Sequence, residues 1–323
     1  MEMLFHILFS FALAGPVCNR DSSDSLGSNL SSFSSVSQVL ESNQLNRFAA
    51  NPVAFADGPN CFNAALFGKG YVGELTHTSS IEFAFFLEKF CQEVNRPATS
   101  GDIVTVKRND TYAHAALALS NGSIFEKLSS WGSNSQVIPP ESDGRTDQVK
   151  ANEEQERKAS SQYNVRPIKS SKYFNEEQYA GPGTRVSIFS CKDSRAIKKN
   201  LASLNAKTEV SSILKLNKKL ETLIFDQTLD PKWRDSLAQE ITTIAAQIKS
   251  SKLTGDNRLF LFAKAKSLFA QLFDLNSMSW NQSTPSYFRA TTKLSSAIES
   301  LETQVRSDKG EVTRRILRVE NSN

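Results

Sequence analysis

Histidine and cysteine are scarce in this chain, with three histidines and four cysteines among 323 residues. Their spacing fits no pattern of zinc ligands, so the sequence predicts neither a metal site nor a bound cofactor. Lys and Arg outnumber Asp and Glu by only four, and the two kinds of charge are interspersed. A nucleic-acid partner is therefore not expected. A net charge of +4 fits only a weak, peripheral attraction to an anionic surface.

Hydrophobic residues make up 39% of the chain, which is enough for a folded core but does not suggest a membrane bundle. The apolar run at the N-terminus is too short to span a bilayer. It ends in Ala12-Leu13-Ala14 before Gly15, which matches the small-residue pattern of signal-peptide cleavage. We therefore expect a signal peptide over residues 1–14 and a periplasmic or secreted protein.

Composition divides the remaining chain into three parts. Residues 15–45 are rich in Ser, Asn and Asp with few large apolar side chains, which predicts a flexible leader. Residues 46–192 mix helix and strand signals and predict an α+β domain with an exposed, polar insertion over 139–161. Residues 193–323 are rich in helix formers with amphipathic spacing and predict an all-α bundle.

Two helices are predicted in the α+β domain before its strands. One begins at Cys61, directly after a Gly-Pro-Asn turn and cap. The other is capped by Thr78 or Ser79 and is expected to end at Arg96-Pro97, because proline ends helices.

Strand character recurs in five later segments, two of which are joined by Asn121-Gly122, a strong signal for a tight hairpin turn. These segments are expected to form one sheet, and the tight turn predicts that the two strands it joins are antiparallel. The expected strands are about 102–107, 113–119, 123–128, 163–168 and 184–190.

Apolar stripes define the predicted helices of the second half. The clearest stripe follows Asp230-Pro231, a cap with proline at the first helical position. Members of each stripe recur every three or four residues, which is the spacing of one helix face. The stripes are Ile197, Leu201 and Leu204 with Ile213, Leu216, Leu220 and Leu223; Trp233, Leu237, Ile241, Ile244 and Ile248; Leu259, Phe262, Leu268, Phe269, Leu272 and Phe273; and Leu294, Ile298, Leu301 and Val305.

The sequence leaves the pairing of the four cysteines open. In an oxidising compartment an even number is compatible with two disulfides. If Cys61 is a working thiol it stays free, and Cys91 with Cys191 is then favoured over pairs that use Cys18.

Cys61, His114 and Glu126 are the candidate catalytic residues. Cys61 opens a predicted helix, and a helix N-terminus and a neighbouring imidazolium both stabilise a thiolate. His114 precedes the Asn-Gly turn and Glu126 follows it, so an antiparallel pair can bring them together on one face. Lys127 is then expected to point to the other face. Thiol, imidazole and polar group occur in the order that a cysteine hydrolase needs.

These residues, with the Gly-Asp strand start between them, resemble the NlpC-type papain-like cysteine peptidases and amidases. The resemblance covers about residues 52–192 and includes the intervals from Cys61 to His114 and from His114 to Glu126. It implies a papain-like α+β fold in which the cysteine helix packs against an antiparallel sheet. It also implies amide hydrolysis, commonly in peptidoglycan stem peptides. Cys61 would be the nucleophile, His114 the general base and Glu126 the orienting group.

The sequence also suggests candidates for an oxyanion site, a substrate and a partner protein. No tyrosine precedes Cys61, so Asn60, Asn51 or backbone N–H groups are the candidates for holding an oxyanion. A cell-wall peptide or protein is the expected substrate. The C-terminal helices are a candidate docking site for an envelope protein.

Other interpretations of the same residues predict different proteins. A non-catalytic envelope protein would keep the fold as a binding module, and a cytosolic effector acting on host proteins is a third interpretation. Glu126 could form a surface pair with Lys127, and His77 is expected to be solvated. Replacing Cys61 by Ala distinguishes the hydrolase from the binding module, because binding would survive in the module and turnover would vanish in the enzyme.

Overall fold

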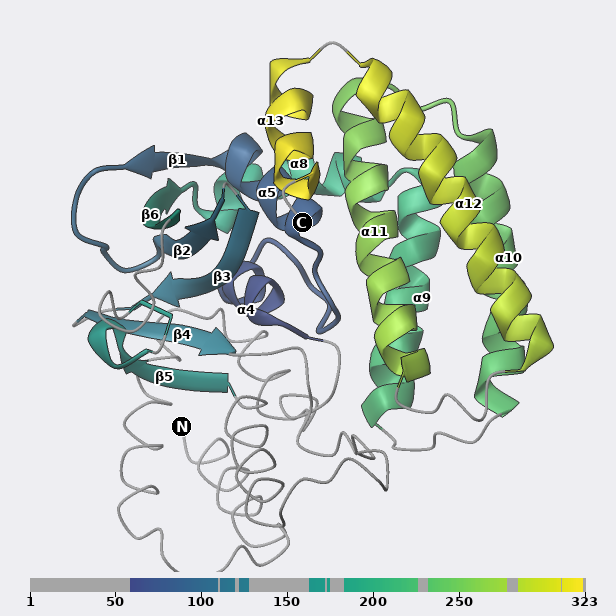
Figure 1. The fold of residues 1–323 in the computed structure, drawn as a ribbon, viewed down its shortest axis with the longest axis horizontal. Coiled ribbons are helices and arrows are strands. Elements are labelled where there is room, and N and C mark those ends of the chain that lie inside the picture. Colours follow the sequence, from purple (N-terminus) through teal and green to yellow (C-terminus); the bar gives the residue numbers. More distant parts are fainter. Residues whose placement is uncertain are drawn as a thin grey trace, which may run out of the picture.

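A computed structural model describes residues 59–109, 111–119, 122–127, 163–171, 173–174, 183–225, 232–277, 284–308 and 310–321. In these residues a six-stranded antiparallel sheet lies beside a group of helices (Figure 1). The predicted α+β class and the antiparallel sheet are therefore confirmed. The predicted signal peptide, leader and 139–161 insertion lie outside the described residues.

The sheet has the strand order β1-β6-β2-β3-β4-β5, and each pair of neighbours is antiparallel. The five predicted strands are confirmed to within two residues, and β1 is an additional strand. The strands are β1 (Cys91–Val94), β2 (Ile103–Arg108), β3 (Thr111–Ala118), β4 (Ser123–Lys127), β5 (Tyr163–Pro167) and β6 (Thr184–Cys191).

Helix α4 (Cys61–Gly68) begins at the predicted residue and packs with all its residues buried against β3 and β4. Its last residue explains the close approach to the sheet. A Cβ atom on Gly68 would lie only 2.9 Å from Leu117 Cδ2 and 3.3 Å from Phe125 Cδ1. Glycine therefore lets the helix axis lie near the sheet.

Helix α5 (Ser80–Phe90) starts after the Ser79 cap, as predicted, but the predicted end at Arg96-Pro97 is wrong. The helix stops at Phe90, and the next four residues form β1, which pairs with β6. Backbone pairing with a strand almost a hundred residues away satisfies these peptide groups in place of helical hydrogen bonds. The spacing of apolar residues near residue 90 gives no information about a strand so distant in the sequence.

The second half consists of helices, as predicted. Most members of the predicted apolar stripes are buried, although Phe273 is 57% exposed. The predicted cap at Asp230-Pro231 lies outside the described residues, and the last helix was not predicted. The helices are α8 (Ser194–Asn205), α9 (Thr208–Phe225), α10 (Lys232–Ser250), α11 (Gly255–Ser277), α12 (Pro285–Ser307) and α13 (Glu311–Asn321).

One hydrophobic core runs from the sheet through α4 and α5 into the C-terminal helices. Phe85 of α5 and Phe260 of α11 are in ring contact within it, with centroids 5.0 Å apart. Helices α11 and α13 consequently pack against α5, and the C-terminal helices lie beside the sheet (Figure 1). Within the described part of the chain, every helix is too short or too polar to cross a membrane.

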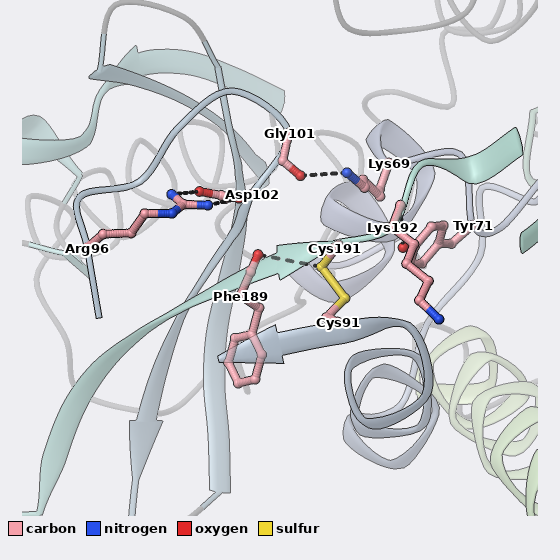
Figure 2. Close-up of a disulfide and its surroundings, with 9 residues drawn as sticks. All are labelled: Lys69, Tyr71, Cys91, Arg96, Gly101, Asp102, Phe189, Cys191 and Lys192. Carbon is pink, nitrogen blue, oxygen red and sulfur yellow. Dashed lines mark hydrogen bonds and ion pairs between the residues drawn. A yellow bond between two sulfur atoms is a disulfide. The ribbon is translucent and has the colours of Figure 1, made fainter. Parts of the chain in front are cut away.

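A disulfide joins Cys91 of β1 to Cys191 of β6, directly opposite each other in the ladder (Figure 2). The bond links residues 100 positions apart and ties the start of the sheet to its last strand. Cys61 is a free thiol. This is the pairing expected if Cys61 is kept for chemistry.

Candidate active site

The place of Cys61 is set by the residue that caps its helix. Asn60 Oδ1 accepts a hydrogen bond from the N–H of Asn63 at 3.0 Å. The same carboxamide binds the backbone of Thr78, donating from Nδ2 to the carbonyl at 2.8 Å and accepting from the N–H at 3.4 Å. Cys61, 8% exposed, thus stands at the firmly capped N-terminus of a helix.

His114 lies on β3 beside a β-bulge. Val106 of β2 is opposite His114, but Lys107 is opposite Tyr112, so Ala113 is the extra residue. Because of the bulge, Tyr112 joins the core beneath the helices while His114 lies with the cluster on the other sheet face. The imidazole is 1% exposed.

Glu126 of β4 is completely buried and binds this imidazole. His114 Nε2 lies 2.8 Å from Glu126 Oε2. Ser171 Oγ donates to the same oxygen at 3.0 Å, and Arg166 Nε lies 3.3 Å from Oε1. Partners on both oxygens hold the carboxylate in one orientation.

Lys127 does not pair with Glu126 at the surface, so that interpretation is wrong. The lysine is also completely buried, and its Nζ donates to the carbonyl oxygen of Pro59 at 2.7 Å. Successive residues of a strand point to opposite faces. Glu126 therefore contacts the imidazole, while Lys127 anchors the turn that leads into Cys61.

The imidazole of His114 lies between the thiol and the carboxylate. Cys61 forms a hydrogen bond with the ring, and since Nε2 faces Glu126, Nδ1 is the nitrogen left for the thiol. Burial by itself would lower the pKa of His114. The charge and hydrogen bond of Cys61, followed by the hydrogen bond and charge of Glu126, outweigh burial and raise the pKa to about 9. The imidazolium is therefore the stable form at neutral pH.

Two aromatic rings cover the imidazole. The Tyr173 ring stacks on it with centroids 4.0 Å apart and an interplanar angle of 18°, and the Phe174 centroid is 5.4 Å away. Both residues follow β5 and the short helix η3 (Ile168–Ser170). This segment, which also supplies Ser171, excludes water from the imidazole–carboxylate bond and so strengthens it.

Backbone groups are the candidates for an oxyanion site. The Asn60 carboxamide, one of the predicted candidates, is already engaged by Asn63 and Thr78. The first N–H groups of a helix have no partner within it, and here these belong to Cys61 and Phe62. They lie beside the thiol, where an oxyanion formed by its attack would develop. Asn51, another predicted candidate, is outside the described residues.

His77 is not the solvated side chain that was expected. It is half-buried, and its Nε2 lies 3.5 Å from Asn60 Nδ2. His77 contacts the cap of α4, but the described contacts do not place it in the series formed by Cys61, His114 and Glu126.

Four residues of the site were not predicted: Arg166, Ser171, Tyr173 and Phe174. A signal for Arg166 exists, because pairing β5 with β4 places it opposite Ile124, two residues from Glu126. The other three lie beyond the paired strand, so neither register nor periodicity points to them.

A cavity of about 520 Å³ lies elsewhere, between residues 73–74 and α9. Glu74, Lys215, Lys218 and Glu221 are among its lining residues. None of the three candidate catalytic residues lines it, so it is not the place of their chemistry. Within the described residues, no group of three or more His, Cys, Asp or Glu side chains is arranged to hold a metal ion.

No protein-family model, curated protein or solved structure matches this chain. The thiol of Cys61 can act as a nucleophile, the His114 imidazole can move its proton, and Glu126 can hold the ring in place.

Proposed function

We propose that this chain is an exported cysteine hydrolase that cleaves an amide bond, with peptidoglycan stem peptides as the substrate class. The observation that carries the proposal is the buried series from the Cys61 thiol through the His114 imidazole to the Glu126 carboxylate. A papain-like domain is part of the proposal. It is supported by α4 packing against the antiparallel sheet whose strands carry the other two residues.

In the first half-reaction, the thiolate of Cys61 attacks the amide carbonyl carbon and forms a C–S bond. The N–H groups of Cys61 and Phe62 stabilise the oxyanion that develops. The His114 imidazolium gives its proton to the leaving nitrogen as the C–N bond breaks. An acyl-enzyme and a free amine result.

In the second half-reaction, neutral His114 accepts a proton from water, and the resulting hydroxide attacks the acyl carbon. The C–S bond breaks, releasing a carboxylic acid product and the Cys61 thiolate beside an imidazolium. Glu126 holds Nε2 throughout, so Nδ1 remains directed at the thiol and the water.

The substrate class is supported by features outside the site. The N-terminal run resembles a secretory signal, which would bring the protein to the cell wall. The net charge of +4 favours anionic wall polymers weakly. The order and spacing of the three residues resemble the NlpC-type enzymes, which commonly act on stem peptides.

The rate of cysteine alkylation tests the proposal directly. Iodoacetamide modification would be followed by mass spectrometry from pH 4 to 9 in the wild type and in His114→Ala. Cys61 is expected to react rapidly well below the ordinary thiol pKa of about 8.5, and His114→Ala should remove this reactivity. Glu93→Gln, which changes a surface carboxylate on the edge strand β1, should leave it intact.

Digestion of purified stem peptides then tests turnover. Cys61→Ala should abolish cleavage without abolishing peptide binding. If Cys61 in the wild type reacts no faster than an ordinary thiol, the hydrolase proposal fails. A binding module, with the C-terminal helices docking an envelope partner, would then be the remaining function.

A further inference from the structure

Helix α11 carries a stripe of three buried polar side chains: Lys264, Ser267 and Gln271. Their spacing of three and four residues places them on one helix face. Their exposed fractions are 4%, 1% and 0%. Polar side chains are this deeply buried only where they have bonding partners. The partners lie in the other half of the chain.

The stripe holds the backbone of residues 77–79. Gln271 Oε1 accepts a hydrogen bond from the N–H of His77 at 2.7 Å. Ser267 Oγ accepts one from the N–H of Ser79 at 2.8 Å. These two N–H groups flank Thr78, so α11 holds the peptide backbone on both sides of it.

Two further contacts of the stripe fix the start of α5. Lys264 Nζ lies 2.7 Å from Glu82 Oε1, and Ser267 Oγ donates to Glu82 Oε2 at 2.5 Å. Glu82 lies in the first turn of α5 and is 2% exposed. The segment before α5 is thus attached to α11 through both backbone and side chain.

Thr78 links the segment held by α11 to the start of α4, where Cys61 lies. Both of its backbone polar atoms bind the Asn60 carboxamide, and its Oγ1 accepts a hydrogen bond from Asn63 Nδ2 at 3.2 Å. Asn60 caps α4, whose first residue is Cys61. A shift of residues 77–79 would therefore move the cap and the N–H groups beside the thiol.

We infer that Gln271 and Ser267 are positioning residues of the active site and that the C-terminal helices are a structural part of it. The inference rests on the proposed function, because it needs Cys61 to be the nucleophile. Apolar side chains would fill the same interface, but only hydrogen-bond acceptors can fix the two N–H groups in place. The stripe thereby orients the capped helix N-terminus on which the thiolate depends.

Variants of the stripe separate positioning from stability. Gln271→Met keeps the length of the side chain and removes the acceptor. Ser267→Ala removes the other acceptor, and Ser267→Thr retains it. Tyr287→Phe is the matched control, because it removes a different buried hydrogen bond of α11, from the Tyr287 hydroxyl to Leu272 O at 3.1 Å.

The measurements are the iodoacetamide rate at Cys61 at pH 7, the pH dependence of that rate and the thermal midpoint. Gln271→Met and Ser267→Ala should slow alkylation about 10- to 100-fold and move its onset to higher pH. Ser267→Thr should react within about twofold of the wild type. Tyr287→Phe should lower the midpoint comparably without changing the rate.

Equal rates in Gln271→Met, Ser267→Ala and the wild type would overturn the inference, as would slow alkylation in Tyr287→Phe. If Gln271→Met does not fold, Ser267→Ala and Ser267→Thr decide the question. An unreactive Cys61 in the wild type refutes this inference and the proposed function together. A reactive wild type with equally reactive stripe variants refutes this inference alone.

Discussion

Replacing Glu126 by Gln changes the charge beside His114 while changing the shape of the side chain very little. The carboxylate is completely buried, and its Oε2 lies 2.8 Å from His114 Nε2. An amide oxygen at the same place can still accept the Nε2–H bond. The substitution therefore tests what the negative charge of Glu126 contributes to the proposed reaction.

The first expected effect is on the pH dependence of turnover. The pKa of His114 is about 9, against an ordinary value of about 6.5. An opposite charge in direct contact changes a pKa by about 1 to 3, and Cys61, which raises the pKa more, remains. We expect Glu126→Gln to lower the pKa of His114 by about 1 to 2. Since the imidazolium must protonate the leaving amine, activity is lost as pH rises through this pKa, and the alkaline limb of kcat/KM moves from about pH 9 to about pH 7 to 8.

The second expected effect is on the rate at pH 6, where the imidazole is protonated in both proteins. A carboxylate only accepts hydrogen bonds, whereas an amide can also donate to Nε2 and favour the wrong tautomer once the ring is neutral. We expect kcat/KM to fall about 100-fold, equivalent to about 2.7 kcal/mol of transition-state stabilisation.

The assay is the pH profile of kcat/KM on a stem-peptide substrate, with Glu93→Gln as control. Glu93 lies on β1, at the far edge of the sheet, and pairs with Arg185 at the surface. The same chemical change there should leave the profile within about twofold of the wild type, because exposed pairs contribute little. An unchanged rate and an unchanged alkaline limb in Glu126→Gln would refute the role of Glu126 as the orienting group.

Three further changes test the surroundings of the site. Tyr173→Ala, which uncovers the His114 ring, should lower kcat about tenfold by admitting water, whereas Tyr173→Phe should retain the rate. Lys127→Met removes the bond to the carbonyl of Pro59, two residues before Cys61, so kcat should fall about tenfold while KM stays nearly constant. Replacing Cys91 and Cys191 by Ala should cost about 2 to 5 kcal/mol in urea unfolding, because the bond closes a loop of 100 residues. A midpoint unchanged by this double replacement would contradict the last expectation.

Local signals predicted the elements that carry the candidate site. The Asn60 cap and the turn before it predicted the start of α4 at Cys61, and the structure confirms it. The Asn-Gly signal and the apolar segments predicted β3 and β4, which pair as antiparallel neighbours. The approach of Glu126 to His114 followed from that pairing. The bulge at Ala113 was not predicted, and it places Tyr112 on the opposite face of the sheet from His114.

The predictions from the sequence were wrong or incomplete where segments distant in the chain meet. The helix expected to reach Arg96-Pro97 ends at Phe90, because pairing with β6 converts the next residues into a strand. Ser171 reaches Glu126 across 45 positions of sequence. Gln271 reaches the backbone of His77 across 194 positions, and no periodic pattern relates such residues.

The sequence by itself determined most of the helices and strands, although not β1 or α13, and identified the side chains able to carry out thiol chemistry. It could do so because caps, tight turns and apolar spacing act over only a few residues. Only the tertiary structure decided that His114 is buried between Cys61 and Glu126, that Tyr173 covers it, and that α11 binds the backbone of His77 and Ser79. These contacts depend on register and on the packing of one shared core, which arise when segments far apart in the chain come together.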